Sequence, residues 1–241
     1  MMHRTNLLGL VVVATSIVAC ATPGTKPEDM SSASHEAAAR QEEGAAAEHA
    51  AQFDPNAKAT ASNCSPSAQN RAVCWESTFN PTNTHRKQAE KHLEAAAAHR
   101  AASQKLVEVE AAACQGIAEE DRVESPFSHV EDIQRVTLDD IKGGKPAGKN
   151  PIGATVYFRA VPGLTQEWLQ RIVDCHLARN AALGFEVPEM AYCPLAVRGV
   201  TASVSSVGNG FAVELRAKTP EEIAELQRRA QALGPVAQSA R

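Results

Sequence analysis

The predicted fold follows from two similar stretches of this sequence: residues 153–171, GATVYFRAVPGLTQEWLQR, and residues 210–228, GFAVELRAKTPEEIAELQR. They align without a gap at an offset of 57 residues, with seven identities in nineteen positions. Each stretch begins with the alternation of a half-buried strand and ends with the periodicity of an amphipathic helix. The identical residues of the first stretch are Gly153, Val156, Arg159, Ala160, Leu169, Gln170 and Arg171. We interpret the two stretches as copies of one strand-and-helix unit.

Other strands are predicted around the two stretches. Gly208-Asn209-Gly210 separates two alternating apolar runs and is a strong hairpin signal, and residues 133–138 occupy the corresponding place before the first stretch. The predicted fold class is therefore α+β. Residues 122–234 are expected to form a duplicated ββα domain, in which two helices cover one face of a four-stranded, largely antiparallel sheet. Residues 235–241 are expected to be a disordered tail.

The segment that precedes this domain is rich in alanine and in other residues that favour helices. Residues 34–53 and about 84–117 predict two helices, and the prolines, serines, asparagines and threonines of residues 54–83 predict a long loop between them. Helices joined in this way predict an antiparallel hairpin over residues 34–121. Its charges would match, because acidic residues of the first helix would face basic residues near the start of the second.

Cysteines occur in a pattern that predicts two disulfides in an oxidising compartment. The pairs Cys64–Cys74 and Cys175–Cys193 each enclose a short segment, so we expect these two bonds. Cys114 would remain unpaired as a small buried residue on a helix, with an intermolecular bridge or a reactive thiol as the alternatives. The alternative is a metal site, because Cys175, His176, Met190 and Cys193 together would suit Cu(I) or, with the cysteines as thiolates, zinc.

The N-terminus has the form of a secretion signal. Arg4 precedes thirteen apolar or small residues, 7–19, a stretch too short to span a bilayer, and Cys20 follows the small residue Ala19. This ending resembles the lipobox of bacterial lipoprotein signal peptides. The resemblance implies that residues 1–19 are removed and that Cys20 carries a lipid anchor.

Residues 20–33 would then be a disordered, lipidated tether between the anchor and the folded chain. Because the residue after Cys20 is Ala21 and not aspartate, the resemblance also implies sorting to the outer membrane, facing the periplasm. The partners expected are the membrane, through the lipid, and an envelope protein or a small ligand. The formal net charge of the whole chain is −4, which argues against nucleic acid as a partner.

Histidines recur at intervals of seven residues on both predicted helices, beside alanines, where they would face the partner helix. The candidate metal ligands are His35, Glu42 and His49 on the first helix, and His85, His92 and His99 on the second. Residues seven apart on one helix are separated by about 10 Å, so one ion could be held only across the hairpin. His49 with His85, or Glu42 with His92, would suit copper, zinc or nickel. Histidines that merely line a polar coiled coil are the competing interpretation.

Recognisable catalytic motifs are missing from the sequence, including the nucleophile elbow, the zinc-protease motif, the phosphate loop and the thiol-oxidoreductase spacing. The favoured hypothesis is a non-enzymatic envelope lipoprotein that acts as a binding or interaction module. The alternative is a lipoprotein that buffers or delivers copper or zinc through its histidines. An envelope hydrolase or redox enzyme is a distant third.

Overall fold

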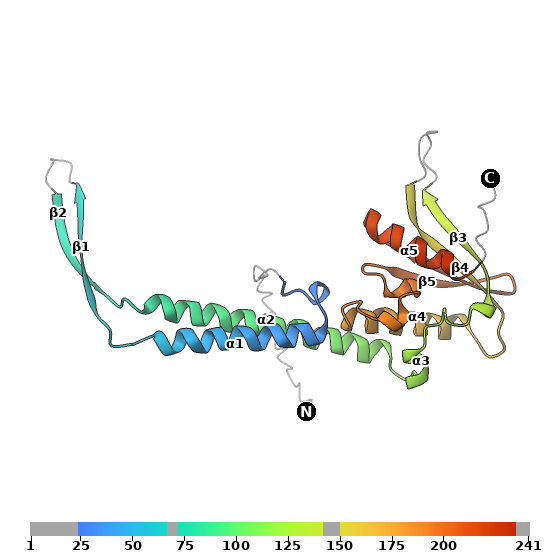
Figure 1. Ribbon diagram of the computed structural model, residues 1–241, viewed down its shortest axis with the longest axis horizontal. Coiled ribbons are helices and arrows are strands. Elements are labelled where there is room, and N and C mark those ends of the chain that lie inside the picture. Colours follow the sequence, from blue (N-terminus) through green and yellow to red (C-terminus); the bar gives the residue numbers. More distant parts are fainter. Residues whose placement is uncertain (1–23, 67–71, 142–149, 235–241) are drawn as a thin grey trace, which may run out of the picture.

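The computed structural model describes residues 24–66, 72–141 and 150–234, and it has two distinct parts. A long pair of helices ends in a two-stranded β-ribbon on one side, and an α+β domain lies at the other end (Figure 1). Among the described residues, no helix has the length and apolar character needed to cross a membrane.

Helices α1 (Ser32–Gln52) and α2 (Asn83–Ala113) lie side by side and run in opposite directions (Figure 1). Ser31 caps α1, since its hydroxyl oxygen accepts a hydrogen bond from the Ser34 amide. The surface between the two helices is built mainly from alanine, which contributes little buried apolar area per residue. The buried alanines are Ala39, Ala46, Ala89, Ala95, Ala96 and Ala102.

The segment expected to be a long loop, residues 54–83, instead contains an antiparallel ribbon. Strand β1 (Ala59–Pro66) pairs with β2 (Ala72–Phe79), and Cys64 lies opposite Cys74. The prediction was wrong because the prolines lie outside the strands or at the end of β1, while the second strand is rich in β-branched and aromatic residues. Those residues favour a strand even though serine, threonine and asparagine surround them.

The C-terminal part is an α+β domain with a four-stranded antiparallel sheet, as the sequence predicts. The strand order is β3-β4-β6-β5. Its main elements are β3 (Ile133–Ile141), β4 (Asn150–Arg159), α4 (Gln166–Ala182), β5 (Thr201–Val207), β6 (Gly210–Arg216) and α5 (Pro220–Ala232). Leu169 and Val173 of α4 and Leu226 of α5 share one buried cluster with strand residues such as Val156 and Val213. Both helices therefore cover the same face of the sheet.

The central strands β4 and β6 carry the two similar stretches, and their register relates one stretch to the other. Val156 pairs with Val213, the residue that matches it at the offset of 57. Gly153 lies opposite Arg216, while its counterpart Gly210 lies opposite Arg159, the counterpart of Arg216. An approximate two-fold axis therefore passes between the two valines.

Short elements connect these parts. They are η1 (Pro27–Asp29), α3 (Glu119–Val123), η2 (Val130–Asp132), η3 (Pro188–Met190) and η4 (Pro194–Ala196). The segment from residue 24 to 31 was expected to belong to a disordered tether, and that expectation was wrong. The guanidinium group of Arg198 donates a hydrogen bond to the Glu28 carbonyl, and η1 contacts α2. These contacts hold the segment around η1 against Arg198 and α2.

Candidate functional site

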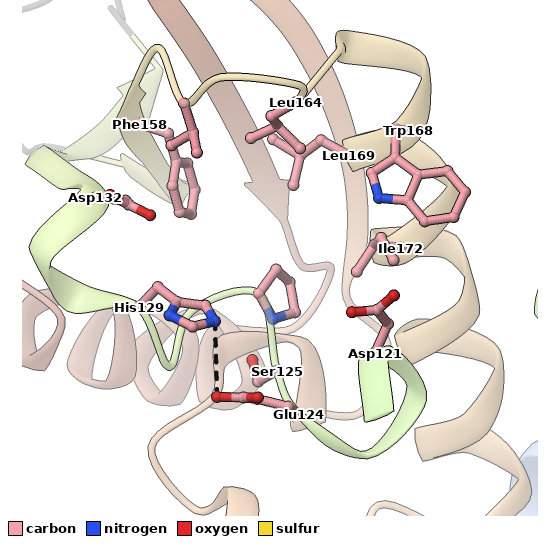
Figure 2. A pocket seen from close by; sticks show the side chains of 12 residues that line it. Asp121, Glu124, Ser125, His129, Asp132, Phe158, Leu164, Trp168, Leu169 and Ile172 are labelled. Atoms are coloured by element: carbon pink, nitrogen blue, oxygen red, sulfur yellow. Dashed lines mark ion pairs between the residues drawn. The ribbon is translucent and has the colours of Figure 1, made fainter. Parts of the chain in front are cut away.

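A cavity of about 320 Å³ opens in the α+β domain, between the segment that follows α2, the end of β4 and the start of α4 (Figure 2). Most of its wall is apolar. The apolar lining residues are Pro126, Phe158, Val161, Leu164, Trp168, Leu169 and Ile172. The polar lining residues are Asp121, Glu124, Ser125, His129 and Asp132. The cavity thus joins an apolar wall to an acidic side.

Helix α4 presents part of the apolar wall because of where it begins. The Thr165 hydroxyl accepts a hydrogen bond from the Trp168 amide at 3.2 Å and so caps the first turn. Trp168 and Ile172 are then four residues apart on the helix and share one face. Phe158, near the end of β4, packs against Phe127 with ring centroids 5.7 Å apart. The strand and the helix thereby hold opposite parts of the wall.

Carboxylates on the acidic side are only partly neutralised. Asp132 pairs with Arg159 at 2.7 Å. Glu124 lies 3.7 Å from the His129 ring, and the dashed line in Figure 2 marks this contact. No hydrogen bond or ion pair of the Asp121 carboxylate is found within residues 24–66, 72–141 and 150–234. A positively charged group in the cavity would therefore meet unpaired negative charge.

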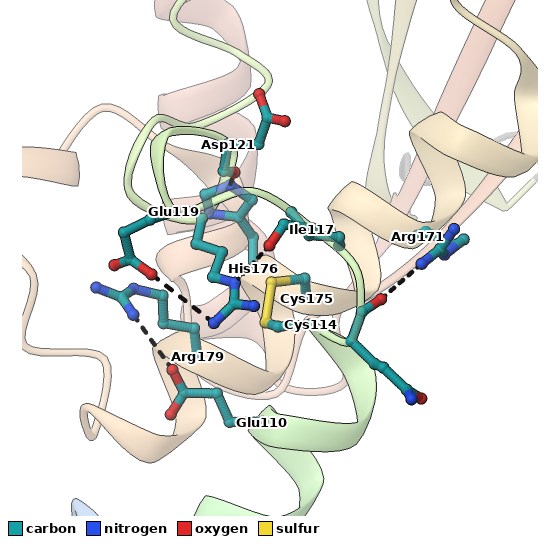
Figure 3. Close-up of a disulfide and its surroundings, with 11 residues drawn as sticks. Glu110, Cys114, Ile117, Glu119, Asp121, Arg171, Cys175, His176 and Arg179 are labelled. Carbon is teal, nitrogen blue, oxygen red and sulfur yellow. Dashed lines mark hydrogen bonds and ion pairs between the residues drawn. A yellow bond between two sulfur atoms is a disulfide. The ribbon is translucent and has the colours of Figure 1, made fainter.

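Behind the cavity, a disulfide joins α2 to α4, and it corrects the predicted pairing. Cys175 is bonded to Cys114, with Cα atoms 4.6 Å apart, and not to Cys193 (Figure 3). The prediction favoured partners close in sequence, whereas packing of the end of α2 against α4 brings together two cysteines 61 residues apart. Arg171 donates a hydrogen bond of 2.6 Å to the Gln115 carbonyl, and Arg179 pairs with Glu110.

Cys193, which the prediction paired, is a free and buried thiol. The hydroxyl of Ser125 donates a hydrogen bond to its sulfur at 3.0 Å. Burial raises the pKa of the Cys193 thiol, so the neutral form is favoured. Because Cys175 is bonded to Cys114, Cys175 and Cys193 cannot together form a thiolate metal site. The other predicted disulfide, Cys64–Cys74, is present.

The disulfide is in direct contact with the cavity wall. Cys114, Cys175, Ile117 and Ile172 form a buried cluster, against which Trp168 packs. Since Ile172 and Trp168 also line the cavity, the disulfide supports the wall from behind. The geometry of the cavity therefore depends on the junction between α2 and the α+β domain.

His176, next to Cys175, holds another part of that wall. It is fully buried, and its Nε2 lies 3.0 Å from the Asp121 carbonyl oxygen, to which it donates. Its Nδ1 has no hydrogen-bond partner in the described chain. Burial lowers the pKa of His176, and the nearby backbone of Asp121 and Glu124 opposes that effect in part.

The predicted histidine positions meet in pairs along the surface between α1 and α2, here called the histidine seam. The Nδ1 atoms of His35 and His99 are 3.0 Å apart, and those of His49 and His85 are 3.2 Å apart. Between these layers, His92 Nδ1 lies 2.6 Å from a Glu42 carboxylate oxygen. The cross-helix pairs His49–His85 and Glu42–His92 are those named from the sequence.

Within the described ranges, no group of three or more histidine, cysteine, aspartate or glutamate side chains is placed to hold one metal ion. The ring of His92 stacks on that of His49, with centroids 5.5 Å apart and 13° between the ring planes. Any ion in the histidine seam would therefore have two ligands from the protein. Cys20, the predicted lipidation site, lies outside the described residues.

Sequence reasoning did not identify the cavity. Periodicity places Phe158 in a strand and Trp168 and Ile172 in a helix, with no sign that they line a cavity, and the acidic residues belong to a segment without a repeating pattern. Residues 121–132 lie close to α4 because of tertiary packing, and no local sequence pattern predicts this contact. Comparison of the chain with protein-family models, with curated proteins and with solved structures finds no match.

Proposed function

We propose that this chain is a non-enzymatic, lipid-anchored envelope protein whose cavity binds an amphipathic ligand carrying a positive charge. One observation carries the proposal: an apolar cavity of about 320 Å³ whose remaining wall is acidic. Cavities of roughly 300 Å³ or more with a few convergent polar groups are typical of small-ligand sites. The same volume would accept a side chain or two from a partner protein.

The charge of the ligand follows from the two carboxylates at Asp121 and Glu124. Asp121 has no ion-pair partner in the described chain. The Glu124 carboxylate lies 3.7 Å from a histidine ring and accepts a hydrogen bond from the Ser128 hydroxyl at 3.0 Å, and it has no lysine or arginine partner in the described chain. An ammonium or guanidinium group close to them would be stabilised, and a carboxylate or phosphate would be repelled. The apolar wall would contribute most of the binding free energy.

A binding role without catalysis is supported by how the polar lining residues are engaged. The Ser125 hydroxyl donates to the buried Cys193 sulfur, while His129 contacts the carboxylates of Glu124 and Glu131. The serine and the histidine are therefore not paired with each other, because each one contacts a different group. This arrangement does not activate a nucleophile.

Cys20 as a lipid anchor would set the place of the cavity in the envelope. Cys20 precedes Gly24 by four residues, and four residues of extended chain reach at most about 14 Å. The anchor would therefore hold the α+β domain close to the membrane, with sorting to the outer membrane and exposure to the periplasm as the lipobox implies. The helical pair would project the ribbon away from that domain (Figure 1).

The ribbon supports the role of an interaction module. Val73, Trp75 and Phe79 alternate along β2, so they share one face of the ribbon, and each side chain is exposed. Aromatic residues of this kind are enriched in the surfaces that bind other proteins. We further infer that the α+β domain arose from a duplicated ββα unit, because β4 and β6 pair about their matching valines.

A matched pair of probes tests the proposed ligand chemistry: 4-phenylbutylamine, a cation, and 5-phenylvalerate, an anion with the same apolar part. The secreted chain would carry Cys20→Ala, to prevent lipidation, and Trp75→Phe. Trp168 is then the only tryptophan and reports binding at the cavity through its fluorescence. We expect saturable binding of the amine, and at least tenfold weaker binding of the carboxylate.

Asp121→Asn should weaken amine binding by roughly fivefold, since it removes about 1 kcal/mol of electrostatic attraction. Asp174→Asn is the matched control, because Asp174 lies on α4 but does not line the cavity. Equal binding of the two probes, or equal effects of the two substitutions, would refute the proposed ligand class.

A further inference from the structure

We propose that His49 and His85 form a binding site for a divalent transition-metal ion, Zn²⁺ or Cu²⁺, between α1 and α2. The two histidines would supply both protein ligands through Nδ1, and water would complete the coordination. The site is separate from the cavity of the α+β domain, since it lies toward the ribbon end of the helical pair, at the last turn of α1 and the first turn of α2.

The distance between the two nitrogens carries the proposal. His49 Nδ1 and His85 Nδ1 are 3.2 Å apart. Two nitrogens bound to one zinc ion at about 2.0–2.1 Å, with a tetrahedral angle between the bonds, are separated by about 3.3 Å. An ion could therefore take the place of the proton between the two rings with little movement of either helix.

Proton balance also permits this exchange at neutral pH. A neutral imidazole has one proton, which it carries on Nδ1 or on Nε2. When an ion binds Nδ1 of both rings, the proton that lay between them moves to the Nε2 of its own ring. Each ligand stays neutral, so no proton needs to be released from the protein.

Solvent access distinguishes this layer of the histidine seam from the other His–His layer. His49 and His85 are half-buried, so water can reach an ion between them. His35 and His99 are only 0% and 7% exposed, which leaves no room for the water ligands that a two-histidine site requires. The partly exposed layer is therefore the one that can bind metal.

The neighbouring layer stabilises the site. The His92 ring stacks on the His49 ring, and the Glu42 carboxylate holds His92 at 2.6 Å. This stacking fixes the orientation of the His49 ring, and the nearby carboxylate favours a cation. His92 is thus a positioning residue, because its Nδ1 is directed to Glu42 and not to the ion.

The ligand set selects the kind of ion. Neutral imidazole nitrogens with water suit Zn²⁺, Cu²⁺ and Ni²⁺, whereas Mg²⁺ and Ca²⁺ prefer oxygen ligands. A bound ion would join two helices whose buried contact is mostly alanine. Metal binding would therefore also stabilise the helical pair, which gives the proposal a second measurable consequence.

Calorimetric titration of the secreted Cys20→Ala chain with zinc chloride, and separately with copper chloride, tests the site at pH 7.4 and pH 5.5. We expect one ion per chain at pH 7.4, and at least tenfold weaker binding at pH 5.5, where protons compete for the imidazoles. His49→Gln and His85→Gln should each weaken binding by at least tenfold. The control Glu94→Gln changes an exposed side chain of α2 outside the histidine seam and the cavity, and it should leave metal binding unchanged.

Thermal unfolding followed by helical circular dichroism provides the second readout. Zinc should raise the unfolding temperature of the parent chain, and chelation should reverse the rise. Neither effect should occur in His49→Gln, whose helical content should equal that of the parent. Heats equal to dilution for the parent chain, or equal binding by the parent and both glutamine variants, would overturn the proposal. Amine binding to the cavity should be unaffected by zinc, so either proposal can fail alone.

Discussion

His176 shows how one buried side chain links the cavity wall to pH. Nε2 donates to the Asp121 carbonyl, so the neutral ring is bound in a defined orientation. A second proton would have to be placed on Nδ1, which is buried and has no partner in the described chain. Burial is thus the main reason why the pKa of His176 is lowered.

Stability should therefore decrease in mild acid. Below the ordinary histidine pKa of 6.5, the unfolded chain binds a proton that folded His176 resists, so the free energy of unfolding falls as pH decreases. Above that pH both states are neutral and the effect vanishes. We expect His176→Gln to reduce the pH dependence between pH 7.5 and 5, as measured by urea unfolding. His129→Gln, which changes an exposed ring, should retain it; identical slopes in all three proteins would contradict this role.

At the scale of elements, the pairing of β4 with β6 requires glycine at two matching positions. A Cβ atom at Gly153 would lie 1.9 Å from the Leu215 carbonyl oxygen, and one at Gly210 would lie 2.0 Å from the Phe158 carbonyl oxygen. Leu215 and Phe158 are themselves counterparts at the offset of 57. The repeated glycine in the two stretches is thus explained by close approach of the strands.

Alanine at either glycine should destabilise the domain strongly. Because the clash is with backbone, the strands must separate, and we expect a loss of about 3 kcal/mol or more for Gly153→Ala and for Gly210→Ala. Gly44→Ala is the control, since a Cβ at this position in α1 meets nothing within 4 Å. It should stabilise α1 by about 0.5–1 kcal/mol. Chemical unfolding measures all three, and a tolerated Gly153→Ala would show that the register is wrong.

The β-ribbon is an element that local contacts maintain without a core. A lone two-stranded hairpin is marginally stable in water. Here the Cys64–Cys74 bond joins the strands, and the Thr82 hydroxyl and the Asn80 side chain both donate to the Asp54 carbonyl at the base. The exposed face of the ribbon is thereby kept in one conformation, which lowers the entropy cost of binding a partner.

At the scale of the whole molecule, the Cys114–Cys175 disulfide fastens the helical pair to the α+β domain. The bond closes a loop with a sequence separation of 61. Contacts between α2 and α4 and the Glu110–Arg179 ion pair act at the same junction. Motion of the long helices relative to the cavity should therefore be small while the disulfide is intact.

The double substitution Cys114→Ser/Cys175→Ser should remove about 4 kcal/mol of stability, as loop-closure entropy estimates for a loop of this length. Cys64→Ser/Cys74→Ser is the control, because it affects the ribbon and should leave the unfolding midpoint of the α+β domain unchanged. Alkylation of the denatured, unreduced Cys20→Ala chain should label Cys193 alone. Labelling of Cys114 instead would support the Cys175–Cys193 bond that the sequence predicts.

Local patterns in the sequence determined much of the fold. Alternation and helical periodicity in residues 153–171 and 210–228 predicted the α+β class and the antiparallel sheet, because side-chain burial imposes these periods. Alanine content and heptad spacing placed the histidines on facing sides of two helices. Cys64 and Cys74 were paired correctly because they lie across one short connection.

Only the tertiary structure decided the Cys114–Cys175 bond, the β-ribbon and the cavity. The first joins residues that are distant in sequence, and no local pattern records which helix end packs on which helix. The cavity is formed by residues 121–132 lying against α4 and the end of β4, so its apolar wall and its acidic side come from segments with no common motif. Periodicity indicates which face of an element is buried, whereas the partner of that face is selected by packing of the whole chain.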